Sequence, residues 1–307
     1  MRLIITGASG FLGRNLLLAI PKGWETLALY HRSRDFVPFL RRSHLRQVQP
    51  LRCDLRRGSE LKRRRVLARN VFDACVYLAA NGDPALSVAD PEQDFRMTAL
   101  TVLNFLACVK VKRFIYLSSG AVYDGRRGPV SPKSPLHPQL PYAISHSAAE
   151  QYVKSSCQYR GNPEEYLIVR FFGAYGPYEP PRKIYTRLVR AFAKEERRNF
   201  QIRGDGKNLI DAMYVTDAVE AILRALRSPL RNTTFDLCSG KPLSVEQLVR
   251  KAASVFGATS LRIRKAGVTA EPIHFRASTR FQKEKLRFTP KVPLETGLKK
   301  LADFLGL

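Results

Sequence analysis

Short apolar runs of strand length alternate with amphipathic stretches of helix length through the first half of the chain. The pattern predicts strands at 3–6, 26–30, 46–51, 74–79, 113–118 and 166–170, and helices at 11–20, 59–69, 94–109 and 142–159. A loop is expected at 129–141, which contains five prolines. Strands that alternate with helices are typical of a parallel sheet covered by helices. The first half therefore predicts an α/β fold built on a doubly wound parallel sheet.

The alternation loosens after Gly176-Pro177. From there the pattern predicts a basic helix at 184–197, a strand at 209–215, a helix at 217–227, a strand at 234–237 and further helices at 245–256 and 294–304. We expect one domain to comprise residues 1–176, with 208–237 returning to it. Residues 177–207 and 238–307 would then form a smaller C-terminal α/β lobe that binds the substrate.

Gly7, Gly10 and Gly13 connect the first predicted strand to the first predicted helix with the spacing G-x-x-G-x-x-G. Gly7 permits a tight turn, Gly10 lets backbone N–H groups approach a pyrophosphate, and Gly13 lets the helix pack closely against the strand. The helix begins at Phe11 and Leu12, and its N-terminus favours an anion. Because the triplet stands between a strand and a helix, it predicts that residues 1–176 form an NAD(P)-binding domain of the Rossmann type.

The end of the second predicted strand indicates the preferred coenzyme. Sites that prefer NAD place a carboxylate there, which accepts a hydrogen bond from the ribose 2′-hydroxyl, whereas NADP sites place Arg. Here Arg32, Ser33 and Arg34 precede the first carboxylate, Asp35. A cluster of this kind suits a 2′-phosphate. We expect NADP, with NAD as the alternative; the other interpretation of the two arginines is a basic surface loop.

Composition narrows the class of protein. With 45% apolar residues, a chain of 307 residues can bury a substantial core without disulfides or metals. The five cysteines form no C-x-x-C pair, so we expect reduced thiols and no metal site. Neither a secretory signal nor an apolar run of membrane-spanning length is recognisable, and the chain is expected to be soluble and cytoplasmic.

The net charge of +26 arises from 52 basic and 26 acidic side chains. Such an excess favours an anionic partner, which can be a nucleotide, a nucleic acid or an anionic membrane surface. The basic run at 62–65 is expected to be the solvated face of a helix. No DNA- or RNA-binding motif accompanies the charge, so we expect no specific nucleic-acid partner. Association with a membrane surface rests on the charge alone.

Further characteristic segments stand at the ends of the predicted strands and nearby. They are Cys53-Asp54-Leu55, Leu78-Ala79-Ala80, Leu117-Ser118-Ser119-Gly120-Ala121-Val122-Tyr123, Tyr142-Ala143-Ile144-Ser145-His146, the stretch RFFGAYGP at 170–177, and Met213-Tyr214-Val215-Thr216-Asp217. Together with the glycine turn, they resemble the extended short-chain dehydrogenase/reductases of the NAD-dependent epimerase/dehydratase family, which act on nucleotide-linked sugars. The resemblance covers nearly the whole chain.

The resemblance implies catalytic roles for Ser119 and Tyr142, and it places His146 where the family has a catalytic Lys. Besides the glycine turn, it implies coenzyme contacts from Asp54, Leu55, Leu78, Ala79, Ala80, Tyr142, His146 and Phe172. It also implies a nucleotide-diphosphate sugar as the substrate, and a homodimer formed through the helices near 94–109 and 142–159.

The histidine is the main departure from the family pattern. Hydride transfer at a sugar carbon requires a proton to move on or off the adjacent oxygen, and a Tyr hydroxyl can move it if its pKa of ~10 is lowered. A neutral imidazole at the i+4 position would do little to lower the pKa of Tyr142. Protonation of His146 would restore the charge, and we expect Glu150, one turn further along, to favour it. The chain either works with His146, which we favour, or is a coenzyme-binding relative with impaired catalysis.

Two other departures concern the substrate. Gly173 occupies the position of the family's Asn, and Ile210 occupies the position where many relatives carry an Arg for the substrate diphosphate. We expect other basic residues to bind that diphosphate. The full set of expected substrate contacts is Asn81, Ser119, Gly120, Arg182, Lys183, Arg187, Arg276 and Arg280.

Gly120 and Ala121 stand where relatives that eliminate water carry an adjacent Asp-Glu pair, which argues against 4,6-dehydratase activity. Two reactions remain, 4-epimerisation and the reduction of a 4-keto sugar, and the NADP-type arginines favour net reduction. A hypothesis of another class is a non-catalytic NADP-binding or scaffold protein whose basic surface docks on a membrane or a partner.

Overall fold

The computed structural model of the chain describes residues 1–194, 199–258, 260–267 and 274–307, which form two compact units. Unit 1 comprises Met1–Asp124, Pro135–Phe171 and Ile222–Phe235, and unit 2 comprises Gly125–Ser134, Phe172–Ala221 and Asp236–Leu307. Unit 1 therefore ends at Phe171, a few residues before the expected boundary at 176. Of the segment expected to return to it, only Ile222–Phe235 does so.

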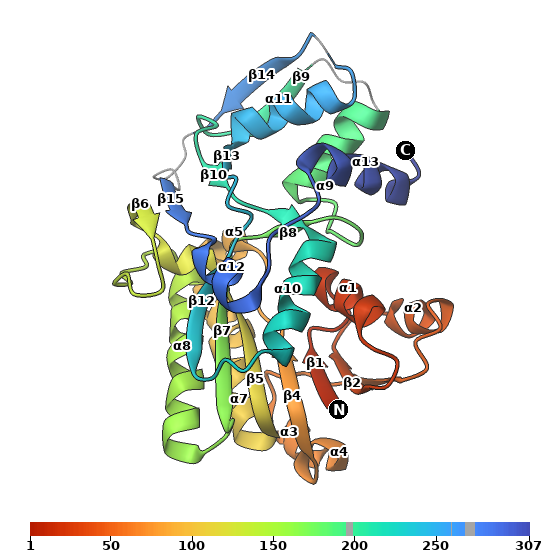
Figure 1. Cartoon of the computed structure of the whole chain (residues 1–307), viewed down its shortest axis with the longest axis vertical. Coiled ribbons are helices and arrows are strands. Elements are labelled where there is room, and N and C mark those ends of the chain that lie inside the picture. The colour runs from red at the N-terminus through yellow and green to blue at the C-terminus, as the bar shows by residue number, and fades with distance from the viewer. Residues whose placement is uncertain (195–198, 259, 268–273) are drawn as a thin grey trace. The chain divides into compact units, whose positions relative to one another are not determined.

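A seven-stranded sheet is the centre of unit 1, and its strand order is β12-β7-β5-β4-β1-β2-β3 (Figure 1). Its strands are β1 (Arg2–Thr6), β2 (Glu25–Tyr30), β3 (Val48–Arg52), β4 (Val71–Tyr77), β5 (Lys110–Ser119), β7 (Glu165–Phe171) and β12 (Thr233–Leu237). The pairs from β3 through β2, β1, β4 and β5 to β7 are all parallel. This confirms the predicted doubly wound sheet, in which the strand order reverses between β1 and β4, the place where such sheets bind ligands.

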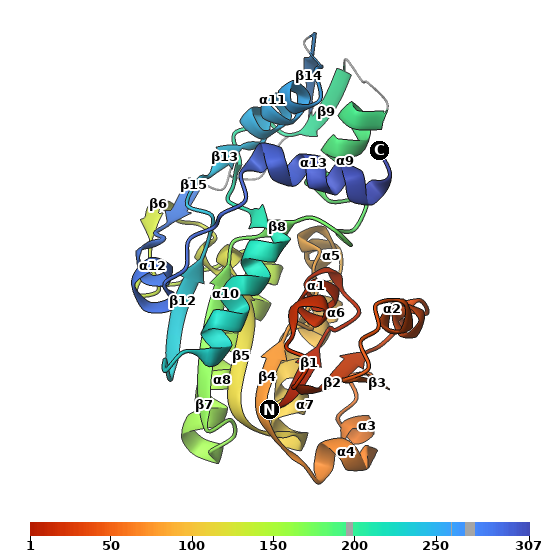
Figure 2. The ribbon, with the colours of Figure 1, turned by 45° about the vertical axis from the view of Figure 1, so that its right-hand side comes forward.

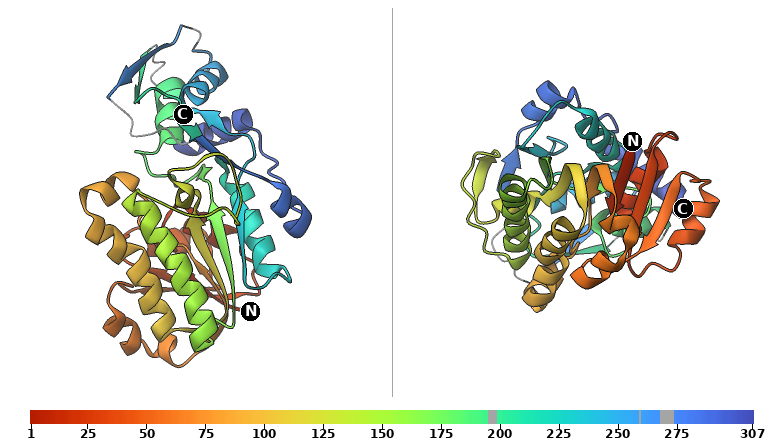
Figure 3. Two further views of the ribbon diagram at one scale, coloured as in Figure 1. Left: turned by 90° about the vertical axis from the view of Figure 1, so that its left-hand side faces the viewer. Right: turned by 90° about the horizontal axis from the view of Figure 1, so that it is seen from below.

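Helices cover both faces of this sheet, with α1 in front of β1 and with α7 and α8 behind the strands (Figure 2). The helices of this unit are α1 (Phe11–Ala19), α2 (Phe36–Arg42), α3 (Gly58–Arg63), α4 (Arg65–Ala68), α5 (Pro84–Ala89), α6 (Pro91–Met97), α7 (Ala99–Cys108), the short 3₁₀ helix η1 (Gly120–Tyr123) and α8 (Pro141–Arg160); α10 (Val215–Arg227) is shared by the two units. The left view of Figure 3 shows α7 and α8 side by side, and they pack directly on each other.

Two helices predicted as continuous are broken, so these predictions were wrong. The helix expected at 94–109 is interrupted at Thr98, whose hydroxyl accepts the backbone N–H of Asn81 at 3.1 Å. The helix expected at 59–69 is interrupted at Arg64, which is extended (φ −80°, ψ 96°) and donates to the carbonyl oxygen of Arg52 at 3.1 Å. In both cases, a contact distant in sequence holds the residue at the break.

A buried ion pair joins α8 to the sheet. Glu150 is 0% exposed and Arg170, on β7, is 3% exposed, with Nη2 and Oε2 2.7 Å apart. The Ser118 hydroxyl on β5 donates to Glu150 Oε1 at 2.6 Å, and Arg170 Nη1 donates to the Tyr123 hydroxyl at 3.0 Å. The two charges therefore neutralise each other, and their network fixes α8 against β5, β7 and η1.

Unit 2 is built from short strand pairs and helices. Its strands are β6 (Arg127–Val130), β8 (Ala174–Tyr175), β9 (Asn199–Arg203), β10 (Leu209–Ile210), β11 (Met213–Tyr214), β13 (Leu243–Ser244), β14 (Arg262–Ala266) and β15 (His274–Ala277). Its helices are α9 (Ile184–Val189), the π-helical turn η2 (Arg190–Lys194), α11 (Val245–Val255), α12 (Arg280–Leu286) and α13 (Leu294–Leu305). A separate apolar core contains Tyr185, Leu188, Phe192, Leu248 and Leu298.

Three sequence predictions for unit 2 were wrong in detail. The start of the expected loop at 129–141 belongs to β6, which pairs in parallel with β15. The helix expected at 184–197 becomes a π-helical turn after Val189, and its last residues lie outside the described part of the chain. The strand expected at 209–215 is split at Asp211, whose Oδ1 accepts the backbone N–H groups of Ser239 and Gly240.

Within the described residues, every helix is too short or too polar to cross a bilayer. All five cysteines are free thiols, and Cys53, Cys75 and Cys238 are buried. Burial raises the pKa of the Cys75 thiol well above its ordinary value, so this side chain remains a neutral part of the core.

We expect Glu150→Gln to lower the free energy of unfolding by about 3–5 kcal/mol, because it leaves Arg170 buried without its counter-charge. Urea denaturation of the whole chain measures the loss. The control is Glu92→Gln, which removes an exposed pair with Arg96 on α6 and should cost less than about 1 kcal/mol. Equal losses in the two variants would contradict the structural role of the buried pair.

Candidate coenzyme and active site

The glycine turn between β1 and α1 is too crowded for side chains. Gly7 has φ +64°, and a Cβ on it would lie 3.0 Å from the backbone of Leu78 and Ala79. A Cβ on Gly13 would lie 2.5 Å from the carbonyl oxygen of Gly7 and 2.6 Å from that of Ala8. Gly10 caps α1 in an extended conformation, and no side chain caps the helix. The N-terminus of α1 therefore presents backbone N–H groups, which suit an anion.

A cavity of about 550 Å³ opens in unit 1 beside this turn. Of the residues predicted to contact the coenzyme, those that line it are Gly7, Gly10, Arg32, Ser33, Asp54, Leu55, Leu78, Ala79 and Ala80. Gly13 lies behind the turn, Phe11 and Leu12 form the first turn of α1, and Arg34 is exposed and outside the lining. We therefore leave Arg34 out of the site.

Sequence reasoning missed other lining residues, which are Ser9, Leu29, Tyr30, His31, Cys53, Arg56, Leu86, Gln93, Met97 and Thr101. Tyr30, His31 and Arg56 adjoin strand ends that the sequence had already singled out, so their positions carried a signal. The residues of α5, α6 and α7 carried none, because only the fold brings these helices to the cavity.

At the end of β2, the first carboxylate is already paired. Arg14, on α1, donates to Asp35 Oδ2 at 2.8 Å and to the Ser33 hydroxyl at 3.2 Å. The Ser33 hydroxyl donates to Asp35 Oδ1 at 2.6 Å, and this hydrogen bond together with Arg14 lowers the pKa of Asp35. The charge of Asp35 is thus balanced by Arg14, and Arg32 remains in the cavity lining.

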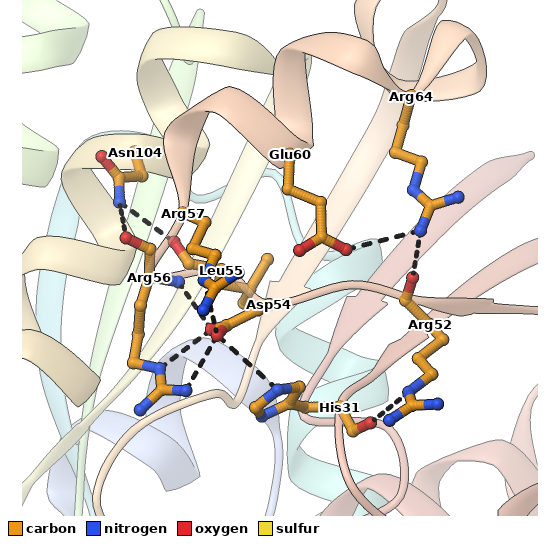
Figure 4. Close-up of polar contacts among 9 residues, drawn as sticks. All are labelled: His31, Arg52, Asp54, Leu55, Arg56, Arg57, Glu60, Arg64 and Asn104. Carbon is orange, nitrogen blue, oxygen red and sulfur yellow. Dashed lines mark hydrogen bonds and ion pairs between the residues drawn. The ribbon is translucent and has the colours of Figure 1, made fainter.

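A second paired carboxylate stands after β3 (Figure 4). The Arg56 guanidinium donates two hydrogen bonds, of 2.9 and 2.8 Å, to the Asp54 carboxylate, and the Arg56 backbone N–H donates a third. These bonds lower the pKa of Asp54 to about 2. His31 Nε2 lies 3.6 Å from the same carboxylate, but partial burial lowers the pKa of His31. This end of the cavity therefore presents a fixed guanidinium plane and an imidazole.

The candidate catalytic residues Ser119, Tyr142 and His146 meet at the carboxyl end of β5. Tyr142 stands in the first turn of α8, whose start is held because Asp124 Oδ2 accepts the backbone N–H groups of Gln139 and Leu140. The Ser119 side chain lies near enough to the Tyr142 hydroxyl to lower its pKa, and the Tyr142 and His146 rings are 4.6 Å apart between centroids. Burial raises the pKa of Tyr142, and the neighbouring Ser119 side chain offsets only part of this rise.

His146 is held as a neutral side chain. It is 3% exposed, its Nδ1 lies 3.0 Å from the Tyr116 hydroxyl, and burial lowers its pKa to about 4. The expectation that Glu150 would favour a charged His146 was wrong, because that carboxylate is bound to Arg170 and Ser118. In the described part of the chain, His146 Nε2 has no hydrogen-bond partner.

This geometry is accompanied by matches to known proteins. Residues 3–238 match the NAD dependent epimerase/dehydratase family. The chain belongs to this family. Among its relatives is an uncharacterized UDP-glucose epimerase, YtcB of Bacillus subtilis (strain 168), which is 26% identical over 97% of this chain and 96% of its own length. The resemblance to extended short-chain dehydrogenase/reductases, as enzymes of nucleotide-linked sugars, is thereby confirmed.

Two other relatives of this family illustrate its range of reactions. GDP-6-deoxy-D-mannose reductase of Pseudomonas aeruginosa is 28% identical over 83% of this chain and 80% of its own length. The crystal structure of UDP-glucose 4-epimerase from Thermotoga maritima, with UDP-glucose, superposes with a TM-score of 0.87 at 25% identity, covering 100% of this chain and 99% of that one. The family thus includes both epimerases and reductases.

Several residues expected to contact the substrate are engaged elsewhere. The Asn81 amide donates to Asp94 Oδ1 at 2.7 Å and exchanges hydrogen bonds with the backbone of Asp83, so it serves the structure of unit 1. Gly120 is buried in η1, where the Ala121 N–H donates to the Ser119 hydroxyl.

The remaining candidates belong to unit 2. Arg187 lies over the Phe200 ring at 5.5 Å, and Arg280 pairs with Glu284 at 2.7 Å. Arg276 is exposed on β15, and Arg182 and Lys183 precede α9. Phe172 also belongs to unit 2, where its N–H donates to the carbonyl oxygen of Leu237 and its ring packs edge-on against Phe275.

We expect Gly13→Ala to weaken NADPH binding by about tenfold or more, because the added methyl group forces apart the turn and the start of α1. Isothermal titration calorimetry measures the change, and circular dichroism verifies that the variant is folded. Gly23→Ala is the control, since nothing lies within 4 Å of its added Cβ. Unchanged affinity in a folded Gly13→Ala variant would refute the assignment of the turn.

Proposed function

We propose that the chain is an NADPH-dependent reductase of a 4-keto sugar linked to a nucleoside diphosphate. The observation that carries the proposal is the Tyr142 hydroxyl, whose pKa is raised by burial, beside Ser119 and a neutral His146 whose ring centroid lies 4.6 Å from that of Tyr142. When bound, a nicotinamide coenzyme supplies the hydride. The residues of this chain bind the coenzyme, orient the sugar oxygen and deliver its proton.

Two features of unit 1 support a bound coenzyme, one in the turn beside the cavity and one at His146, which lies outside the cavity lining. The tight turn can form only because Gly7 and Gly13 lack a Cβ that would meet the backbone, and α1 begins beside it without a side-chain cap, which leaves its N–H groups for an anion. His146 Nε2 is a buried polar atom that lacks a partner among the described residues, as expected for a group that a ligand satisfies. We assign the pyrophosphate to Gly10, Phe11 and Leu12, and the adenosine to the side lined by His31, Asp54 and Arg56.

Our preference for NADP over NAD depends on the charges at the end of β2. An NAD site needs a carboxylate there that is able to accept from the ribose 2′-hydroxyl. The nearest one, Asp35, is occupied by Arg14 and Ser33, whereas Arg32 lines the cavity. A guanidinium in this position supports binding of a 2′-phosphate.

The protonation states of Tyr142 and His146 favour reduction over epimerisation. A 4-epimerase must first remove a proton from the sugar hydroxyl, which requires a phenolate that a nearby cation stabilises. Here burial raises the pKa of Tyr142 and His146 is uncharged, so Tyr142 remains protonated at neutral pH. A protonated phenol is ready to donate to the oxygen of a keto sugar, which Ser119 would orient. The similarity to GDP-6-deoxy-D-mannose reductase supports the same direction.

The neutral His146 also favours a second function, a coenzyme-binding protein without turnover. Tight binding of NADPH, combined with no consumption of NADPH across a panel of nucleoside-diphosphate 4-keto sugars, would select this function. In either case, exposed apolar side chains on α6 (Phe95) and α8 (Ile144, Tyr152 and Tyr159) support our proposal of a homodimer through α6, α7 and α8. We also propose that the protein is cytoplasmic, because free thiols such as its five cysteines are typical of a reducing compartment.

We expect Arg32→Ala to raise the Kd for NADPH by about 10- to 100-fold and to leave that for NADH nearly unchanged, because a charge-assisted bond to the 2′-phosphate contributes roughly 1.5–3 kcal/mol. Fluorescence titration with each nucleotide measures both constants. Arg34→Ala is the control, with the same charge change on an exposed side chain outside the cavity. If both nucleotides weaken equally, the assigned preference is wrong.

We expect Tyr142→Phe to reduce NADPH consumption with keto sugars by about 100-fold or more, since it removes the proton donor. Tyr152→Phe, an exposed tyrosine on the same helix, should retain full activity. Because the raised pKa of Tyr142 keeps the acid form present below about pH 10, the wild-type rate of the proton-dependent step should be flat at neutral pH and fall only above that value. A rate that rises from pH 6 to 9 would argue for a phenolate, and so against the proposed direction.

A further inference from the structure

Tyr116 and His146 form a buried pair behind the candidate proton donor. Tyr116, on β5, is 0% exposed, and its hydroxyl lies 3.0 Å from His146 Nδ1. The other imidazole nitrogen, Nε2, is buried and has no partner among the described residues. The ring of His146 lies against that of Tyr142. One nitrogen is therefore committed within the protein, and the other is left for a ligand.

The hydrogen bond decides which nitrogen carries the proton. If the Tyr116 hydroxyl donates to Nδ1, the phenol proton is satisfied and the imidazole proton sits on Nε2. If Nδ1 carried the proton instead, it would donate to the Tyr116 oxygen and leave the buried phenol proton without the one acceptor that the structure shows for it. The first arrangement leaves only the Nε2–H without a partner in the protein, whereas the second leaves both the Tyr116 proton and the Nε2 lone pair unpaired. The geometry therefore favours the Nε2–H tautomer.

The charges around the imidazole do not favour a cation. On α8, Glu150 is bound to Arg170 of β7 and to Ser118 of β5. On α6, Asp94 Oδ1 accepts from the neutral Asn81 amide and Oδ2 has no partner among the described residues, yet burial is the one cause that acts on the pKa of His146. Tyr116 and Tyr142, the two phenols that face the imidazole, are neutral because burial raises the pKa of each. Burial likewise lowers the pKa of His146.

We propose that the Tyr116 hydroxyl fixes His146 as the neutral Nε2–H tautomer, so that His146 serves as an uncharged hydrogen-bond donor to a ligand hydroxyl beside Tyr142. This inference rests on the proposed function in one respect, because the hydroxyl we assign belongs to a ribose of the nicotinamide coenzyme. Tyr116 is a positioning residue, which acts through His146. The pair orients the coenzyme without supplying the positive charge that would stabilise a Tyr142 phenolate.

The decisive experiment is two-bond ¹H–¹⁵N spectroscopy of the full chain labelled with ¹⁵N-histidine. This measurement distinguishes the Nε2–H tautomer, the Nδ1–H tautomer and the imidazolium. The chain has five histidines, and the His146 signals are those that His146→Gln removes. We expect the Nε2–H pattern for His146 from pH 6 to 8 in the free protein, and a change in its Nε2 resonance on addition of NADPH.

Tyr116→Phe should produce a mixture of both tautomers and bind NADPH about tenfold more weakly, the loss expected when one hydrogen-bond donor is no longer oriented. Tyr77→Phe is the matched control, because it removes an equally buried hydroxyl from the neighbouring strand β4. It should leave the His146 spectrum unchanged. Equal tautomer mixing in the two variants would overturn the role of Tyr116, and so would an unchanged spectrum in Tyr116→Phe.

An imidazolium or an Nδ1–H pattern in the free wild-type protein would overturn the proposal. If NADPH binds but leaves the Nε2 resonance unmoved, the ligand assigned to His146 is wrong. If NADPH does not bind at all, the proposed function fails together with that ligand, whereas the spectrum of the free protein still decides the tautomer.

Discussion

The ion pair between Glu150 and Arg170 determines both where α8 lies and which charges remain for the candidate site. Both side chains are almost fully buried, so neither can be moved without leaving the other uncompensated. The pair fixes α8 against β7, and Ser118 ties the same carboxylate to β5. This places Tyr142, two turns before Glu150, and His146, one turn before it, at the end of the sheet. It also occupies the one carboxylate of α8 that stood near enough in sequence to charge His146.

Because of this ion pair, the candidate site keeps the geometry of the family pattern but differs from that pattern in its electrostatics. Ser119 and Tyr142 meet as the resemblance implied, but the residue in the position of the Lys is a neutral imidazole whose Nδ1 faces Tyr116. The fold therefore does not determine the reaction. The doubly wound sheet presents the same strand ends in all these proteins, and the reaction depends on the side chains placed there. In this chain they suit the donation of a proton better than its removal.

Much of the fold could be predicted, because it depends on local patterns. Apolar runs such as 113–118 are strands because both faces of the sheet are covered, and Gly7 and Gly13 are recognisable because only glycine fits the turn. The errors lie where contacts distant in sequence override local preference. Asn81 interrupts a helix at Thr98, and the backbone of Ser239 draws Asp211 out of a predicted strand.

The same distinction applies to the site. Positions could be read from motifs, whereas protonation and pairing could not. The pairing of Asp35 with Arg14, and of Glu150 with Arg170, depends on residues about 20 positions away in the sequence.

The most direct test of the whole account is a crystal structure of the protein grown with NADPH. We predict a pyrophosphate at the N-terminus of α1, a 2′-phosphate at Arg32, and a ribose oxygen within hydrogen-bond distance of His146 Nε2. A cavity that remains empty, or a nicotinamide ribose that contacts neither Tyr142 nor His146, would contradict it.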